Sequence, residues 1–161
     1  MAHRPQKPGR KIRVFLVDDH PAVRRGLELL LSREPDLEVC GQAAGARNTL
    51  KQVLVCEPDL AVVDLVLREG HAFKLIADLR AHHPRLKILV FSMHDHANFT
   101  KRAFAAGANG FVAKDDGAAL LIEAIRVVMG GGSFPATTTA VGLRRDSDAR
   151  PGETIRPLPS P

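Results

Sequence analysis

Residues 60–65 (Leu-Ala-Val-Val-Asp-Leu) form a short apolar run that is interrupted by one carboxylate near its end. A run this short and this rich in β-branched residues is typical of a strand that a parallel sheet buries on both faces. Open parallel sheets bind their ligands just beyond the carboxyl ends of the strands. The run therefore predicts an α/β protein with Asp64 at the edge of the sheet where a functional site would lie.

Four other apolar runs alternate with segments whose apolar residues recur at helical spacing. The predicted strands are residues 12–17, 37–43, 60–65, 86–91 and 109–113. The predicted helices begin at Pro21, cover about 46–57, extend from Ala72 to the His83–Pro84 pair, and cover about 97–106 and about 116–129. This alternation predicts a doubly wound parallel sheet with helices on both faces. In the helix at about 46–57 we expect Leu50, Val53 and Leu54 to be buried.

Polar side chains lie within two residues of the ends of four predicted strands. They are Asp18 and Asp19, Asp64, Ser92 and Lys114. Right-handed crossovers place all strand ends of this kind at one edge of the sheet, so we expect these side chains to meet. Taken singly, each has an ordinary explanation as a turn former, a helix cap or a surface residue. Their joint placement favours a shared functional site.

The chemistry of this set suits a phosphoryl group. Three neighbouring carboxylates repel one another unless a cation lies among them, and oxygen ligands suit Mg²⁺. Asp64 could attack phosphorus as a nucleophile. Lys114 could neutralise the phosphoryl oxygens, and the Ser92 hydroxyl could donate a hydrogen bond to one of them.

Composition restricts the class of protein. The 161 residues suffice for one domain with a core, and no apolar run approaches the roughly 18 residues of a membrane span. No apolar signal segment follows the basic N-terminus, so we expect a cytoplasmic protein.

Cys40 and Cys56 have neither disulfide-framework nor metal-site spacing and are expected to be small buried apolar residues. The net charge of +5 comes from the two ends of the chain and is only a weak indication of nucleic-acid binding.

The chain divides into three parts by composition. Residues 1–11 are predicted to be a flexible basic arm, residues 12–132 the folded domain, and residues 133–161 a proline-rich, largely disordered tail with room for one short helix near 136–143. The fragment His94–Asp95–His96 could bind a metal, but a single short cluster is more typical of a solvated loop.

Four segments together resemble the response-regulator receiver domains of two-component systems. They are residues 17–21 (Val-Asp-Asp-His-Pro), 63–65 (Val-Asp-Leu), 91–94 (Phe-Ser-Met-His) and 106–114 (Ala-Gly-Ala-Asn-Gly-Phe-Val-Ala-Lys). The first and last are most similar to the NarL/FixJ (LuxR-like) class of transcription regulators. The resemblance covers about residues 11–132.

The resemblance implies a flavodoxin-like (βα)5 fold with strand order 2-1-3-4-5. It also implies that a partner histidine kinase phosphorylates Asp64, with Mg²⁺ held by Asp19, by Asp64, by Asp18 through water, and by the backbone carbonyl of Val66. Lys114 would then be the phosphoryl partner. Ser92 and Phe111 would be a switch pair, in which Phe111 turns inward after phosphorylation. Chemistry would be limited to self-phosphorylation and self-dephosphorylation, so an enzyme in the usual sense is not expected.

The sequence departs from the family pattern in three places. Arg68 and Ala72 stand where proline and glycine are usual, and the helix-turn-helix DNA-binding domain of similar regulators does not follow residue 132. We therefore expect no sequence-specific DNA binding by this chain alone. Phosphorylation could promote a homodimer through the face formed by helix 97–106, strand 109–113 and helix 116–129.

Two other functions remain open at this point. A receiver fold can act as a phosphate-independent interaction module, although the complete acidic set argues against it. A small Mg²⁺-dependent phosphohydrolase of the haloacid dehalogenase-like type would need a second aspartate two residues after its nucleophile. That position is Val66 here, and there is no cap domain to bind a substrate.

Overall fold

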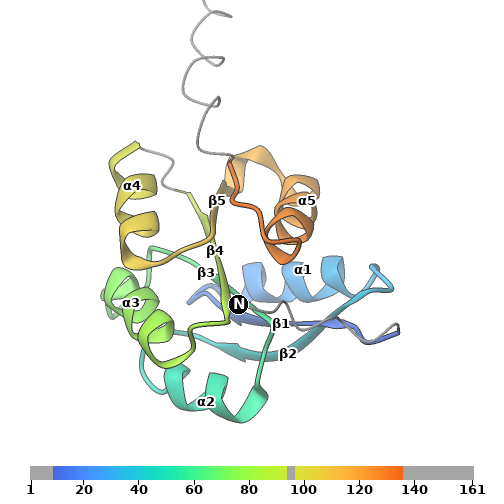
Figure 1. Ribbon diagram of the computed structural model, residues 1–161, viewed down its shortest axis with the longest axis horizontal. Coiled ribbons are helices and arrows are strands. Elements are labelled where there is room, and N and C mark those ends of the chain that lie inside the picture. The colour runs from blue at the N-terminus through green and yellow to red at the C-terminus, as the bar shows by residue number, and fades with distance from the viewer. Residues whose placement is uncertain (1–8, 94–96, 136–161) are drawn as a thin grey trace, which may run out of the picture.

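The computed structural model describes residues 9–93 and 97–135, and within these ranges it forms one five-stranded parallel sheet with helices on both faces (Figure 1). The strands are β1 (Ile12–Val17), β2 (Leu37–Ala43), β3 (Leu60–Val63), β4 (Lys87–Ser92) and β5 (Gly110–Ala113). The helices are α1 (Pro21–Leu31), α2 (Thr49–Cys56), α3 (Ala72–His82), α4 (Ala97–Ala106) and α5 (Ala118–Met129), with a 3-10 turn at Lys114–Asp116. The strand order β2-β1-β3-β4-β5 confirms the predicted fold.

Two apolar layers enclose the sheet. Figure 1 shows α1 and α5 on one side and α2, α3 and α4 on the other. Side chains alternate between the layers along each strand: Phe15 and Val17 face α2–α4, whereas Val14 and Leu16 face α1 and α5. All four residues of β3 are buried, which is why its sequence is continuously apolar.

The register of β1 and β3 brings the first two carboxylates together. Val17 pairs with Val63 in the parallel ladder, so Asp18 and Asp64 each follow the last paired residue of their strand. The backbone N–H of Asp64 donates to the carbonyl of Val17 at 2.8 Å, which continues the ladder to the aspartate. The sheet itself therefore fixes the separation of these two residues.

The face that α2 buries differs from the predicted one. Val53 is buried and Leu50 is half-buried as expected, but Leu54 is 55% exposed, so that part of the prediction is wrong. Thr49 is buried in the core instead of Leu54, because the Thr49 hydroxyl donates to the carbonyl of Gly45 at 2.5 Å. The buried pair Thr49 and Val53 leaves Leu54 on the solvent side.

A strap of residues 133–135 covers the outer edge of β5, inside the segment predicted to be a disordered tail. The N–H of Phe111 donates to the carbonyl of Phe134 at 2.6 Å, and the N–H of Phe134 donates to the carbonyl of Asn109 at 3.2 Å. The Phe134 side chain packs against the α1–α5 layer. The remaining predictions for residues 1–8, the His94–Asp95–His96 fragment and the short helix near 136–143 lie outside the described residues.

Arg80 forms a polar clamp at the opposite edge of the sheet from the carboxylates. Its guanidinium donates to the carbonyls of Gly107 and Leu86, both at 2.8 Å, and to Asn109 Oδ1 at 2.7 Å. Asn109 Oδ1 also accepts the N–H of Ile88 at 2.9 Å. Burial lowers the pKa of Arg80 below its ordinary value. The clamp joins α3, β4 and the turn before β5.

Gly41 and Gly26 offer a matched test of this packing. A Cβ at Gly41 would lie 2.6 Å from the Phe15 ring and 2.8 Å from Cys56 Sγ, whereas a Cβ at Gly26, within α1, would have no neighbour within 4 Å. We expect Gly41→Ala to lower the free energy of unfolding by about 1–3 kcal/mol through overpacking. Gly26→Ala should raise it by about 0.5–1 kcal/mol because alanine favours helix. Urea unfolding of both variants measures this, and equal effects would contradict the assigned packing.

Candidate functional site

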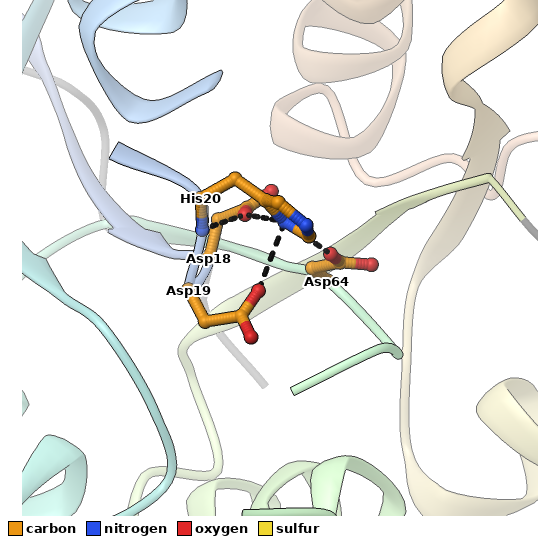
Figure 2. A group of neighbouring side chains, drawn as sticks. All are labelled: Asp18, Asp19, His20 and Asp64. Carbon is orange, nitrogen blue, oxygen red and sulfur yellow. Dashed lines mark hydrogen bonds and ion pairs between the residues drawn. The ribbon is translucent and has the colours of Figure 1, made fainter. Parts of the chain in front are cut away.

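Asp18, Asp19 and His20 follow β1, Asp64 follows β3, and one ligand atom from each lies within 4.8 Å of all the others. Figure 2 shows the four side chains converging from the two adjacent strand ends. The structure thus brings together the three carboxylates expected from the sequence. His20 joins them, although the sequence assigned it no role.

Asp18 is 3% exposed and fully engaged. Its Oδ1 accepts the backbone N–H of His20 at 2.8 Å, and its Oδ2 accepts Lys114 Nζ at 2.7 Å. Its backbone carbonyl accepts the guanidinium of Arg24, one turn into α1. These contacts fix the turn between β1 and α1 against the end of β5.

Asp64 is 2% exposed, and each of its oxygens has one donor. The backbone N–H of Val66 donates to Oδ1 at 3.1 Å, and Lys114 Nζ donates to Oδ2 at 3.0 Å. A carboxylate held in this way keeps a fixed direction, and the side chain of Val66, two residues further along the chain, is 41% exposed. Both oxygens of Asp64 therefore have a fixed position in the pocket.

Lys114 neutralises two buried carboxylates at once. Burial alone would lower the pKa of Lys114, but the hydrogen bonds and charges of Asp64 and Asp18 outweigh it and raise the pKa above its ordinary value of 10.5. The ammonium also lies 5.9 Å from the centre of the Phe91 ring. The side chain is thus a fixed positive charge at neutral pH, directed at the acidic pocket.

Asp19 has a buried carboxylate oxygen that accepts no hydrogen bond. Its side chain is 7% exposed, and its Oδ2 accepts the N–H of Arg68 at 3.0 Å. Its Oδ1 is buried without a well-directed hydrogen bond, although His20 Nδ1 lies 2.9 Å away. A buried acceptor without a donor costs about 1–3 kcal/mol, and a bound cation would remove that cost. The donor set, all oxygen apart from His20, fits a small divalent ion.

Ser92 is the last residue of β4, and Phe111 lies on the neighbouring strand β5. Ser92 is completely buried, and its register partner Ala113 directly precedes Lys114. Phe111 is 6% exposed and packs into the α2–α4 layer. The Phe111 ring therefore lies inward in this structure, and its role in a switch stays a prediction.

Comparison with known proteins identifies the family. The profile of the response regulator receiver domain matches residues 14–126, so the chain belongs to that family, as its motifs predicted. Receiver domains bind Mg²⁺ at an acidic pocket, and this structure has an aspartate-rich group at Asp18, Asp19 and Asp64. They are parts of response regulators, which pair with histidine kinases, and are signalling proteins rather than classical enzymes.

Among curated proteins, the chain is 36% identical to the DNA-binding transcriptional activator DevR/DosR of Mycobacterium tuberculosis, over 82% of this chain and 61% of the relative. It is 32% identical to the transcriptional regulatory protein DegU of Brevibacillus brevis, over 77% and 52%. The chain thus spans between half and two thirds of these relatives' length.

Solved structures agree with these relatives. A LuxR-family two-component response regulator from Aurantimonas sp. SI85-9A1 is 35% identical, with a TM-score of 0.73 over 76% of this chain and 88% of that one. The receiver domain of the putative regulator NarL from Mycobacterium tuberculosis is 28% identical, with a TM-score of 0.71 over 76% and 98%. Among residues 9–93 and 97–135, no helix is both long and apolar enough to cross a membrane.

Lys114 provides a test of the electrostatics. We expect Lys114→Ala to lower the free energy of unfolding by about 2–3 kcal/mol in EDTA, because Asp18 and Asp64 lose their counter-ion, and Mg²⁺ should restore part of the loss. The stability that charged Lys114 contributes is complete below pH 10.5 and is lost as the pH rises through its raised pKa. The difference between the two proteins should therefore be constant near neutral pH and shrink above 10.5.

A matched control for that prediction is Lys74→Ala. Lys74 Nζ lies 2.6 Å from Asp78 Oδ2 on the exposed face of α3. An exposed pair of this kind contributes about 0.5 kcal/mol or less. Thermal or urea unfolding with and without Mg²⁺ compares the variants. Equal losses for both, or no response of Lys114→Ala to Mg²⁺, would contradict the assigned role.

Proposed function

We propose that this chain is a phospho-accepting receiver in which Asp64 takes a phosphoryl group from a histidine of a partner kinase. The observation that supports this proposal most strongly is the environment of Asp64. The side chain is 2% exposed, and its two oxygens accept hydrogen bonds from the Val66 N–H and Lys114 Nζ. It also lies beside a buried, unsatisfied oxygen of Asp19. This arrangement favours a reaction at one specific carboxylate.

The transfer would break the nitrogen–phosphorus bond of the kinase phosphohistidine and form an oxygen–phosphorus bond at Asp64. The leaving imidazole keeps the bonding electron pair and takes a proton. In the phosphoryl transition state, charge is spread over the three equatorial oxygens. Lys114 would offset that charge, and the buried Ser92 hydroxyl would donate to one of the oxygens.

Mg²⁺ would be held by Asp19, by Asp64, by the Val66 carbonyl, and by Asp18 through water. The unsatisfied Asp19 oxygen supports this assignment because it is an anionic acceptor left without a donor in a buried position. When bound, the ion would supply positive charge that neutralises the carboxylates and the phosphoryl oxygens. The family's acidic pocket makes Mg²⁺ the expected ion.

The output of such a receiver would be a change in association. We propose that phosphorylation promotes homodimerisation through the α4–β5–α5 face in the cytoplasm, and that Phe111 and Ser92 take part in the change. We further propose that these 161 residues do not read DNA sequence by themselves. A transcriptional role would run through partner proteins or through a longer product.

Two alternatives are less well supported. A phosphate-independent interaction module would gain nothing from two buried carboxylates bridged by Lys114 and a third with an unsatisfied oxygen, because such groups are costly to bury. A phosphohydrolase of the haloacid dehalogenase-like type would need an acid two residues beyond Asp64, where the structure has the apolar side chain of Val66.

The assignment of Asp64 is tested directly by Asp64→Asn. We expect the unmodified chain to be labelled by acetyl phosphate in the presence of Mg²⁺, as a shifted band on a Phos-tag gel, and Asp64→Asn to show no shift. EDTA should abolish the shift and Asp19→Ala should reduce it at least about tenfold, because the ion loses a ligand. Asp78→Asn, an exposed change on α3, should leave it unchanged. Full labelling of Asp64→Asn would falsify the proposal.

The lifetime of the phosphorylated state is predicted to depend on Val66. Val66 follows Asp64 by two residues and is 41% exposed, and its apolar side chain cannot orient an attacking water by hydrogen bonding. We expect Val66→Asn to accelerate loss of the phosphoryl group about threefold or more, because an amide can position water. Val127→Asn, at a similarly exposed position on α5, is the control. Decay of the Phos-tag band measures the rates, and identical rates for Val66→Asn and the unmodified chain would show that another group controls water access.

A further inference from the structure

His20 is held over the acidic pocket by its backbone. It is the N-cap of α1, with φ −90° and ψ 109°, and Pro21 follows it at the first helical position. An extended conformation is the one favoured for a residue before proline. The His20 N–H donates to Asp18 Oδ1 at 2.8 Å, so the same turn fixes both residues. The imidazole is 53% exposed and lies at the mouth of the pocket.

The distances from His20 Nδ1 to the carboxylates are those of atoms that share one small cation. Nδ1 lies 3.0 Å from Asp18 Oδ1, 2.9 Å from Asp19 Oδ1 and 4.0 Å from Asp64 Oδ2. In an octahedral site with bonds of about 2.1 Å, neighbouring ligand atoms are about 3.0 Å apart and opposite ones about 4.2 Å apart. Figure 2 shows the ring directed at all three carboxylates.

The Asp19 oxygen gives independent evidence for a ligand at this point. Oδ1 has no well-directed hydrogen bond, yet it is buried and only 2.9 Å from His20 Nδ1. A close approach of two acceptor atoms is favourable when both bind a common cation. Nδ1 can do so as the neutral tautomer with its proton on Nε2. A plain hydrogen bond from Nδ1–H to Asp18 Oδ1 would account for one of the three contacts but not for the Asp19 oxygen.

We propose that His20 Nδ1 is a further metal ligand in a mixed histidine–carboxylate site, in which Asp18 Oδ1 binds the ion directly rather than through water. The inference rests on the proposed function, since it adds a ligand to the same ion site. Imidazole strengthens binding of first-row transition ions and contributes little to Mg²⁺, which prefers oxygen. The pocket therefore binds Mn²⁺ more tightly relative to Mg²⁺ than three carboxylates alone would.

Mn²⁺ itself is the probe, because its electron spin reports a bound nitrogen directly. The untagged chain is loaded with substoichiometric Mn²⁺ and studied by electron spin-echo envelope modulation. The expected result is nitrogen-14 modulation in the unmodified chain and its loss in His20→Ala. His82→Ala is the matched control, since this exposed histidine at the end of α3 is bonded to the Asp78 carbonyl, and it should keep the modulation.

Affinities give a second readout. Electron paramagnetic resonance at room temperature measures the concentration of free Mn²⁺, which gives the dissociation constant of Mn²⁺. Displacement of bound Mn²⁺ by added Mg²⁺ then gives the dissociation constant of Mg²⁺. His20→Ala should weaken Mn²⁺ about threefold or more and Mg²⁺ less than about twofold, because only the nitrogen ligand is lost. Unchanged nitrogen modulation or an unchanged Mn²⁺/Mg²⁺ ratio in His20→Ala would overturn the inference.

The role of His20 and the proposed function can be disproved separately. If Mg²⁺ binds and labelling of Asp64 requires it, but Mn²⁺ shows no nitrogen modulation in the unmodified chain, the role of His20 is wrong and the proposed function stands. If neither ion binds, the acidic pocket is not a divalent-cation site, and both are wrong. Thermal melting of His20→Ala confirms that the variant is folded in either case.

Discussion

The ammonium group of Lys114 holds together the ends of three strands. It donates to Asp18 after β1 and to Asp64 after β3, while Lys114 itself directly follows β5. Two buried carboxylates without this cation would repel each other and would each lack a counter-charge. The pocket, the turn into α1 and the position of β5 therefore depend on one ion-pair cluster, and a change of charge within it acts on all three strands.

The strand β5, which directly precedes Lys114, is connected to its surroundings at both the strap and the Arg80 clamp. Phe111, in the middle of β5, donates its backbone N–H to the carbonyl of Phe134 in the strap. Arg80 holds the turn before β5 through the Gly107 carbonyl and Asn109. These contacts tie β5 to the segment after α5 and to the end of α3. The acidic pocket and the α4–β5–α5 region are thus joined by consecutive residues of a single strand.

Much of the fold followed from local periodicity. The five apolar runs and their helices were predictable because parallel strands buried on both faces leave a distinct pattern, and the meeting of Asp18 with Asp64 followed from parallel strand ends sharing an edge. Leu54 was misplaced because periodicity cannot tell that the Thr49 hydroxyl will find a backbone acceptor and enter the core. The boundaries drawn at residues 11 and 132 remain predictions.

Other features depend on contacts between residues far apart in sequence, for which one sequence holds no signal. The Arg80 clamp spans from α3 to the turn before β5, and the Phe134 strap pairs with a strand more than a helix away. The position of the His20 ring depends on the Asp18 turn and Pro21 together. Only the Asp-Asp-His-Pro spacing could have drawn attention to His20, and nothing in that spacing shows that the ring reaches Asp19.

The central claim, that this pocket directs phosphorylation to one carboxylate, is tested most directly by mapping the acyl phosphate. The chain is phosphorylated with Mg²⁺ present and treated at once with sodium borohydride, which reduces an aspartyl phosphate to homoserine. Peptide mass spectrometry then locates the change. The account predicts homoserine at position 64 alone. Homoserine at position 18 or 19 with Asp64 intact, or no reduced residue in a protein that carries phosphate, would contradict it.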